Sequence, residues 1–367
     1  MKLSASCLFG VESLTADELR YMGCSDVKIE TGRVLFEGGA EEIAKTNIRL
    51  RTAERVQILA GEFPARSFDE LFEGVKALSW EEFIQKDSAF PVKGHCLDSA
   101  LMSVPDCQRI IKKAMATKLA SVYSLQRLPE TGSELQIRFT INKNIAAIYI
   151  DTSGAALHKR GYRPASAAAP LRETLAAAMV KISRYKGREV FCDPFCGSGT
   201  IAIEAALAAK NRAPGISRRF AAQDWGIISA SVWDKAREEA RASEYSGNYE
   251  IFGSDIDSAC VAAAGENASR AGVSDTIRFF AADALSLKLP GESGILMLNP
   301  PYGERLLTAQ EADKLIKGMG NAWRGLTSWK KYILSSSLDF ERSFGMKAQK
   351  RRKLYNGMIQ CQLYMYY

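Results

Sequence analysis

The chain has little of what metal-dependent, secreted or membrane-spanning proteins need. It has two histidines, His95 and His158, far apart in sequence, so neither a histidine acid–base pair nor a metal cluster is expected. Its eight cysteines include no C-x-x-C pair, which favours reduced thiols and a cytoplasmic location. No apolar run approaches the roughly 20 residues of a membrane span, and the start lacks the apolar region of a signal peptide. We therefore predict a globular protein with no metal and no membrane partner.

Positive charge is only mildly in excess. The net charge is +7 over 367 residues, and the first 170 residues are close to neutral, so the excess lies in the remainder. Lysine and arginine supply contacts to phosphates, but a mild excess is also common in proteins that bind no nucleic acid. The basic run Lys350–Lys353 leaves the same choice between phosphate contacts and a solvated face. Charge alone leaves a nucleic-acid partner open.

The first 155 residues alternate short helix and strand patterns. Helical spacing covers residues 14–22, 40–53, 68–78 and 106–122, and strand patterns cover 27–36, 134–141 and 144–151. This alternation predicts two α+β units. Glycine and proline then punctuate residues 152–170, which we interpret as a hinge.

The second half of the chain has the pattern of a doubly wound α/β sheet. An alanine-rich helix over 171–183 precedes a strand over 189–192, and strand, glycine loop, helix, strand, helix and strand follow in order. A further strand is predicted over Lys331–Ser335. Asn356-Gly357 separates two strand patterns near the C-terminus and predicts an antiparallel terminal hairpin.

The segment Asp193–Thr200, D-P-F-C-G-S-G-T, follows a strand and opens a helix. Gly197 and Gly199 can adopt positive φ, so a ligand can approach the backbone. Such strand–loop–helix crevices are where open α/β sheets bind ligands. The segment is not the G-x-G-x-x-G fingerprint, because residue 202 is alanine, and it lacks the G-K-[ST] ending of a phosphate loop. It predicts a cofactor loop; the alternative is a tight turn with no ligand.

Two later strand ends carry aspartates. Asp255 stands where a carboxylate can accept both hydroxyls of a ribose, with Ile256 placed against an adenine face. Asp283 can accept from the adenine amine. Because 56 residues separate Gly199 from Asp255, an insertion near 211–248 must be looped out of the sheet. A helix-capping role is the alternative for Asp255.

The segment Asn299–Tyr302, N-P-P-Y, ends an apolar strand. The prolines remove donors, so the asparagine oxygen and backbone carbonyls remain as acceptors for a planar amine. Such acceptors free the nitrogen lone pair for attack on a sulfonium methyl, and Tyr302 can stack on a base, worth about 1–3 kcal/mol. No Pro-Cys lies nearby to attack a pyrimidine carbon, and Cys196 fits a packing role. The alternative is a proline-rich loop.

Together these motifs resemble a known family. The order D-P-F-C-G-S-G-T, G-S-D-I-D, A-A-D-A and N-P-P-Y-G-E-R is similar to class I S-adenosylmethionine (SAM)-dependent methyltransferases that act on amino nitrogens. H-K-R-G-Y-R (158–163), A-P-L-R-E-T-L-A-A-A (169–178) and K-L-Y-N-G-M-I-Q-C (353–361) resemble THUMP-domain RNA guanine methylases. The nearest group is the bacterial 23S ribosomal RNA guanine-N(2)-methyltransferases.

The resemblance implies a domain order and a cofactor. A ferredoxin-like domain would cover 1–65, a THUMP RNA-binding domain 66–155, a linker 156–170 and a Rossmann-like domain 171–367. The last would hold a seven-stranded sheet with a terminal antiparallel hairpin. SAM would be the cofactor and S-adenosylhomocysteine (SAH) the product.

The resemblance also assigns residues. The cofactor residues would be Thr174, Asp193, Phe195, Cys196, Gly197, Gly199, Thr200, Asp255, Ile256, Asp283, Ala284 and Asn299, with Thr174 closing over the carboxylate. Asn299, Pro300, Pro301 and Tyr302 would hold a flipped guanine for methylation of its 2-amino group. RNA, above all ribosomal RNA, would be the partner. Transfer RNA guanine, DNA adenine, protein glutamine and a non-catalytic RNA-binding role stay open.

Overall fold

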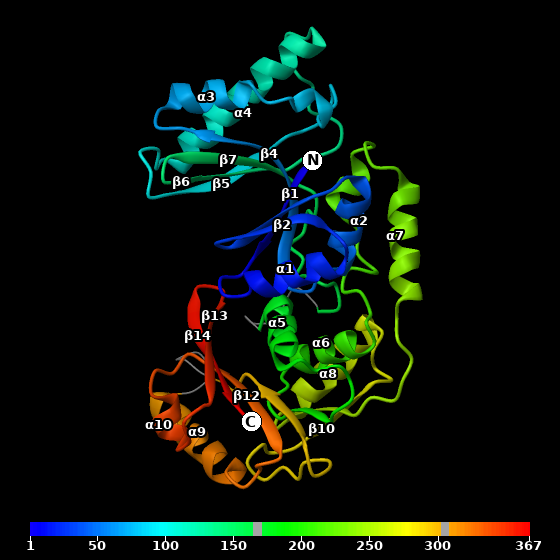
Figure 1. Ribbon diagram of the computed structural model, residues 1–367, viewed down its shortest axis with the longest axis vertical. Helices are drawn as coiled ribbons and strands as arrows, with labels where there is room; N and C mark the ends of the chain where they lie inside the picture. Colours follow the sequence, from blue (N-terminus) through cyan, green and yellow to red (C-terminus); the bar gives the residue numbers. More distant parts are fainter. Residues whose placement is uncertain (164–170, 302–307) are drawn as a thin grey trace.

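The structure is a computed structural model that describes residues 1–163, 171–301 and 308–367. It contains two seven-stranded sheets that lie toward opposite ends of the long axis, each with its own helices (Figure 1). No helix in the described ranges is long and apolar enough to cross a membrane.

The first sheet belongs to the N-terminal half and has the order β2-β3-β1-β4-β7-β6-β5. Its strands are β1 Lys2–Cys7, β2 Ser25–Glu30, β3 Arg33–Glu37, β4 Ala53–Pro64, β5 Val92–Leu97, β6 Ile137–Asn142 and β7 Ile145–Asp151. The long strand β4 pairs antiparallel with β1 on one side and with β7 on the other. This shared strand joins the two predicted α+β units into one sheet.

Four helices accompany this sheet, and one of them corrects a predicted boundary. They are α1 Glu12–Tyr21, α2 Ala40–Arg49, α3 Phe68–Lys76 and α4 Val104–Tyr123. The helix predicted over 40–53 is too long, because Leu50 leaves the helical region at ψ 126° and β4 begins at Ala53. The strand patterns of β4 and β5 were also absent from the prediction.

The second sheet has the order β10-β9-β8-β11-β12-β14-β13. Its strands are β8 Phe191–Asp193, β9 Ile251–Asp255, β10 Ile277–Ala281, β11 Gly294–Leu298, β12 Trp329–Ser335, β13 Lys350–Asn356 and β14 Ile359–Tyr366. The first five in that order are parallel, whereas β14 is antiparallel to both β12 and β13. The predicted doubly wound sheet with a terminal antiparallel hairpin is confirmed.

Helices cover both faces of the second sheet. On one face lie α5 Glu173–Ser183, α6 Thr200–Ala209 and α8 Ser258–Ala271, and on the other lie α9 Ala309–Trp323 and α10 Phe340–Phe344 (Figure 1). Because α6 and α8 follow β8 and β9 while α9 follows β11, the winding reverses between β8 and β11. Open α/β sheets bind ligands at the carboxyl ends of the strands at such a reversal.

The segment between α6 and β9 leaves the second sheet, as the spacing of the motifs predicted. It contains α7, Ala230–Ala242, which packs beside α2 of the first sheet (Figure 1). Lys235 Nζ lies 3.2 Å from Glu41 Oε1. Trp233 stacks on Phe220, with ring centroids 5.4 Å apart, and both rings belong to the apolar core of the first sheet. The insertion therefore completes the N-terminal domain.

Trp233→Ala is expected to destabilise the N-terminal domain by about 3–5 kcal/mol, because it leaves a cavity where the ring is 1% exposed. Trp233→Phe should lose less, because it retains a ring for Phe220. Amide hydrogen exchange in α2 measures the effect locally, and Asp234→Ala, on the exposed face of the same helix, is the control. Unchanged exchange in α2 after Trp233→Ala would contradict this packing role.

The described part of the predicted hinge is packed rather than open. Thr152 and Ser153 are buried and bonded to Asn47 of α2, at 2.9 and 2.6 Å. Arg160 is also buried, and its Nε lies 3.2 Å from Glu204 of α6. Residues 152–163 thus connect the two halves through specific contacts; residues 164–170 of the predicted hinge lie outside the described ranges.

Candidate active site

Four strand ends meet at one edge of the second sheet. Because β8, β9, β10 and β11 are parallel, their carboxyl ends lie together. Asp193 and Asp255 are the last residues of β8 and β9. Asp283 follows β10 by two residues, and Asn299 directly follows β11. The edge thus brings together the four motifs, although Asp193 and Asn299 lie 106 residues apart in sequence.

The predicted cofactor loop is held by its neighbours at β9. The Cys196 N–H donates to the Ser254 carbonyl at 2.9 Å, and the Gly197 N–H donates to Asp255 Oδ2 at the same distance. Gly197 has φ 48° and Gly199 has φ 82°, which are left-handed values that favour glycine. The loop is therefore preformed by backbone geometry.

The two glycines differ in what surrounds them. A Cβ on Gly199 would lie 3.0 Å from Ala264 of α8, so this glycine permits close packing. A Cβ on Gly197 would meet nothing within 4 Å. The space beside Gly197 is therefore open to a ligand, and the loop fits the predicted cofactor there.

Gly197→Ala is expected to lower SAH affinity at least tenfold, because the methyl group enters this open space, while the folded protein loses only about 1 kcal/mol. Isothermal titration calorimetry and thermal unfolding separate the two effects. Gly23→Ala is the matched control, because Gly23 also has positive φ (82°) with no atom near its Cβ position. Equal SAH affinity in both variants would argue against a cofactor lying along Gly197.

Asp193 is the most perturbed carboxyl group of this edge. It is 1% exposed, its Oδ1 accepts from the Phe195 N–H at 3.2 Å, and its Oδ2 has no partner among the described residues. Burial, with a contribution from the charge of Asp255, raises the pKa of Asp193 to about 8. A buried carboxyl without a counter-charge suits a cationic ligand group, and the methionine part of SAM carries an ammonium.

The other two aspartates accept hydrogen bonds from backbone N–H groups. Asp255 accepts from Gly197 and, through Oδ1, from the Asp257 N–H at 3.0 Å; Asp257, not Asp255, caps α8. Ile256 is 76% exposed beside them, an apolar surface available to a ring. Asp283 is exposed and accepts from the Leu285 N–H at 2.9 Å, and its neighbour Ala284 is buried.

Asn299, the first residue of the N-P-P-Y motif, carries a buried oxygen. Its Oδ1 is buried and has no hydrogen-bond partner in the described part of the chain. Pro300, buried, and Pro301, half-buried, follow it and carry no N–H. Tyr302 lies outside the described residues. An orphaned buried acceptor is costly unless a ligand donates to it, since an unmade bond costs about 1–3 kcal/mol.

Four further predicted cofactor residues make contacts within the protein. Thr174 is fully buried and its hydroxyl bonds to Glu54 of β4, so the structure places it at the junction of the two domains. Thr200 Oγ1 accepts from Arg163 at 3.1 Å. Cys196 is buried, and burial raises the pKa of its thiol, which agrees with a packing role. Phe195, half-buried, packs on the core beneath the edge.

Two buried ion pairs behind the loop were not predicted from the sequence. Arg163, which reaches Thr200, also pairs with Glu173 at 2.7 Å, and both side chains are largely buried. Glu204, four residues into α6, pairs with Arg160 and accepts from Tyr162. The H-K-R-G-Y-R segment was the available signal, but its partners lie in other elements. No cluster of metal-binding residues occurs among the described residues.

Comparison with protein families matches three parts of the chain. Residues 2–57 match the RlmL ferredoxin-like domain, residues 65–151 the THUMP domain, and residues 160–365 the RMKL-like methyltransferase domain. The last match alone covers more than half of the chain.

Relatives match nearly all of this chain. YpsC of Bacillus subtilis (strain 168), described provisionally as an RNA methyltransferase, is 44% identical over 100% of this chain and 95% of its own. The ribosomal RNA large subunit methyltransferase K/L of Shewanella baltica (strain OS155) is 33% identical over 97% of this chain. This chain spans only 52% of that relative, about half its length.

Solved structures agree over the full chain. SMU.472, described provisionally as a methyltransferase and crystallised with SAH, is 41% identical with a TM-score of 0.94, covering 100% of this chain and 97% of its own. A Listeria monocytogenes (str. 4b F2365) protein, described by prediction as an N6-adenine-specific DNA methylase, is 42% identical, also with a TM-score of 0.94, covering 100% and 96%.

Proposed function

We propose a function for this chain from its family, because it belongs to the RMKL-like methyltransferases that carry RlmL ferredoxin-like and THUMP domains. In this proposal the protein transfers a methyl group from SAM to the exocyclic 2-amino group of a guanine in RNA. The favoured substrate is 23S ribosomal RNA. The observation that carries the proposal is the buried Asn299 Oδ1, without a partner in the described ranges, at the same sheet edge as the cofactor loop.

The cofactor-binding part of the proposal depends on the loop at β8. Gly197 leaves open space beside the backbone, and Asp193 offers a buried, uncompensated carboxyl for the ammonium of the methionine part. Asp255 and Ile256 would receive the ribose and the adenine, and Asp283 the adenine amine. SAM, when bound, supplies a methyl group on a sulfonium.

Asn299 would act on the substrate amine. The amine nitrogen of guanine is a weak nucleophile because its lone pair is delocalised into the ring. An N–H bonded to Asn299 Oδ1, and a second bonded to a backbone carbonyl of the proline segment, would draw the nitrogen toward tetrahedral geometry. Tyr302 would stack on the extruded base. The base must leave its helix or be unpaired already, because only then can the amine reach the crevice.

An RNA substrate is supported by the domains before residue 155. We propose the ferredoxin-like domain at 1–65, the THUMP domain at 66–155, a linker at 156–170 and the Rossmann-like domain at 171–367. A groove of about 720 Å³ on the first sheet is lined by side chains that include Arg33, Arg138 and Tyr149. Its lining holds four arginines and three glutamates, and we propose it as a candidate surface for RNA. We expect the protein to act in the cytoplasm.

The deciding experiment is mass spectrometry of nucleosides from ribosomal and transfer RNA, comparing cells with and without this chain. We expect 2-methylguanosine to disappear from large-subunit RNA alone. Loss of 2-methylguanosine from transfer RNA would identify transfer RNA as the substrate and would leave the proposed reaction unchanged. Unchanged methylation in every RNA would reject an RNA substrate and leave DNA adenine, the activity ascribed to the Listeria relative, protein glutamine, or a non-catalytic assembly role.

A further inference from the structure

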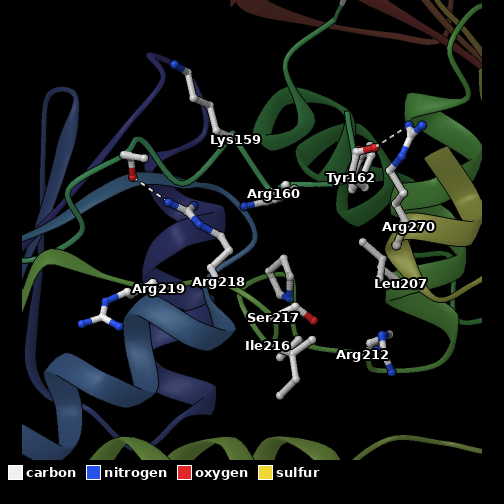
Figure 2. A pocket seen from close by; sticks show the side chains of 15 residues that line it. Lys159, Arg160, Tyr162, Leu207, Arg212, Ile216, Ser217, Arg218, Arg219 and Arg270 are labelled. Carbon is white, nitrogen blue, oxygen red and sulfur yellow. Dashed lines mark hydrogen bonds between the residues drawn. The ribbon is translucent and has the colours of Figure 1, made fainter. Parts of the chain in front are cut away.

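A second cavity, of about 270 Å³, lies away from the predicted active site. Four segments line it: residues 155–162 before α5, residues 212–219 at the start of the insertion, and the C-terminal ends of α6 and of α8 (Figure 2). The cofactor loop precedes the first residue of α6, whereas Leu207 of the same helix lines this cavity. Two helical turns, about 10 Å, therefore separate the two places.

The lining of this cavity is strongly basic. Six of its fifteen side chains are cationic, and none is acidic: Lys159, Arg160, Arg212, Arg218, Arg219 and Arg270. Basic side chains on a protein surface usually alternate with acidic ones. A wall with one sign of charge raises the local concentration of ions of the opposite sign.

Four of the six cations have carboxylate partners, which do not line the cavity. The pairs are Arg160–Glu204, Arg212–Glu244, Arg219–Asp224 and Arg270–Glu266. Lys159 and Arg218 have no carboxylate within ion-pair distance in the described part of the chain. The cavity therefore holds positive charge that the protein does not neutralise.

Arg218 shows this excess most clearly. Its guanidinium is half-buried and donates only to backbone carbonyls, those of Ala155 at 2.7 Å and Ala156 at 3.1 Å. Burial, together with the positive charges of Arg160 and Arg55, lowers the pKa of Arg218 to about 10. Figure 2 shows the Arg218 guanidinium directed to a backbone oxygen, with the side chain of Arg160 nearby.

One donor of Arg212, another residue of the lining, is unused. Arg212 Nε is buried and has no hydrogen-bond partner among the described residues, although its Nη1 reaches Glu244 at 3.0 Å. A buried N–H on a charged group without an acceptor is costly. An anion in the cavity would supply the counter-charge that Lys159 and Arg218 lack.

We propose that this cavity binds a phosphate group. The planar guanidinium fork matches the oxygens of phosphate, and several guanidinium groups converge here from three segments. The volume accommodates a phosphate together with part of the molecule that carries it. That molecule is either the RNA substrate, an identification that rests on the proposed function, or a small phosphate-bearing molecule. The bound group would fasten the insertion and residues 155–162 to the catalytic domain.

The first test uses inorganic phosphate alone as the probe. Sodium phosphate should raise the unfolding temperature of the full chain more than sodium chloride at equal ionic strength. Arg218→Gln should abolish this difference, and Lys159→Ala, an exposed change that spares the fold, should weaken phosphate binding several-fold. Arg342→Gln removes an equal charge from exposed α10 and should bind phosphate like the parent protein.

The second test identifies the source of the phosphate. Affinity for a ribosomal RNA fragment is measured by fluorescence anisotropy over a series of salt concentrations. If RNA supplies the phosphate, Lys159→Ala and Arg218→Gln should each lower the salt slope by about one and weaken binding about equally across sequences.

The outcomes separate clearly. Reduced RNA affinity supports an RNA phosphate, and a phosphate effect with unchanged RNA affinity supports a small phosphate-bearing ligand. If both variants match Arg342→Gln in both tests, the proposal is wrong. The phosphate titration does not depend on methyl transfer, so it remains decisive even if the parent protein methylates no RNA.

Discussion

Asn299→Ala should abolish most methyl transfer while leaving the cofactor bound. The side-chain oxygen is proposed to accept from the substrate amine as the nitrogen becomes tetrahedral, an interaction that strengthens in the transition state. Loss of a single preorganised group of this kind costs about 10²–10³ in turnover. We expect that fall in kcat, measured with labelled SAM and substrate RNA, and SAH affinity within about threefold of the parent protein.

Asn299→Asp is the matched variant, because a carboxylate of nearly the same size keeps an acceptor oxygen. It should retain much more turnover than Asn299→Ala, and the two variants should fold equally well. If Asn299→Ala turns over RNA at close to the parent rate, the acceptor role is wrong. A variant that loses SAH affinity and turnover together would instead place Asn299 on the cofactor.

Asp193→Asn should bind SAH at least a hundredfold more weakly and yet stabilise the ligand-free protein at alkaline pH. The folded-state pKa of Asp193, about 8, lies above its usual value of 3.8. The amide cannot ionise, so its advantage over the carboxyl should grow by at most about 1.4 kcal/mol per pH unit between pH 5 and 8.

Two measurements test whether Asp193→Asn raises stability at alkaline pH and weakens SAH binding. Urea unfolding at pH 5 and pH 8 gives the difference in free energy, with exposed Asp234→Asn as the control. Calorimetry with SAH should show affinity rising nearly tenfold from pH 6 to 7 in the parent protein, because ionising Asp193 becomes cheaper. The pH dependence should be weaker in Asp193→Asn. Equal SAH affinity of parent and variant at pH 8 would refute the ammonium contact.

The edge of the second sheet could be predicted because its signals are local. Each strand end carries its candidate site residue within two positions, as at Asp193, Asp255 and Asn299, and parallel pairing brings the ends together. The terminal hairpin was equally local, since Asn356-Gly357 fixes a two-residue turn and Gly357 has φ 65°.

The structural features that could not be predicted depend on residues that lie far apart in the sequence. The strand β4 is partly buried along its length without strict alternation, so its pattern is not that of a simple amphipathic strand. The Thr174 hydroxyl bonds to Glu54, 120 residues earlier in the chain, and no local pattern encodes such a pairing. The charged groups of the second cavity come from three segments, and each alone has the pattern of an ordinary solvated stretch.

The docking of the insertion on the first sheet has a consequence for synthesis on the ribosome. Chains emerge from the N-terminus, and domains generally fold as units once their residues are available. Here the core of the first domain includes Trp225, Trp233 and Ala240, which follow the end of β7 by about 75 to 90 residues. The first domain must therefore wait, with the surface of α2 uncovered, until α6 and α7 have been translated. Cutting the gene at the apparent domain boundary would yield a fragment with this apolar surface permanently exposed, and such a fragment should aggregate where the full chain does not.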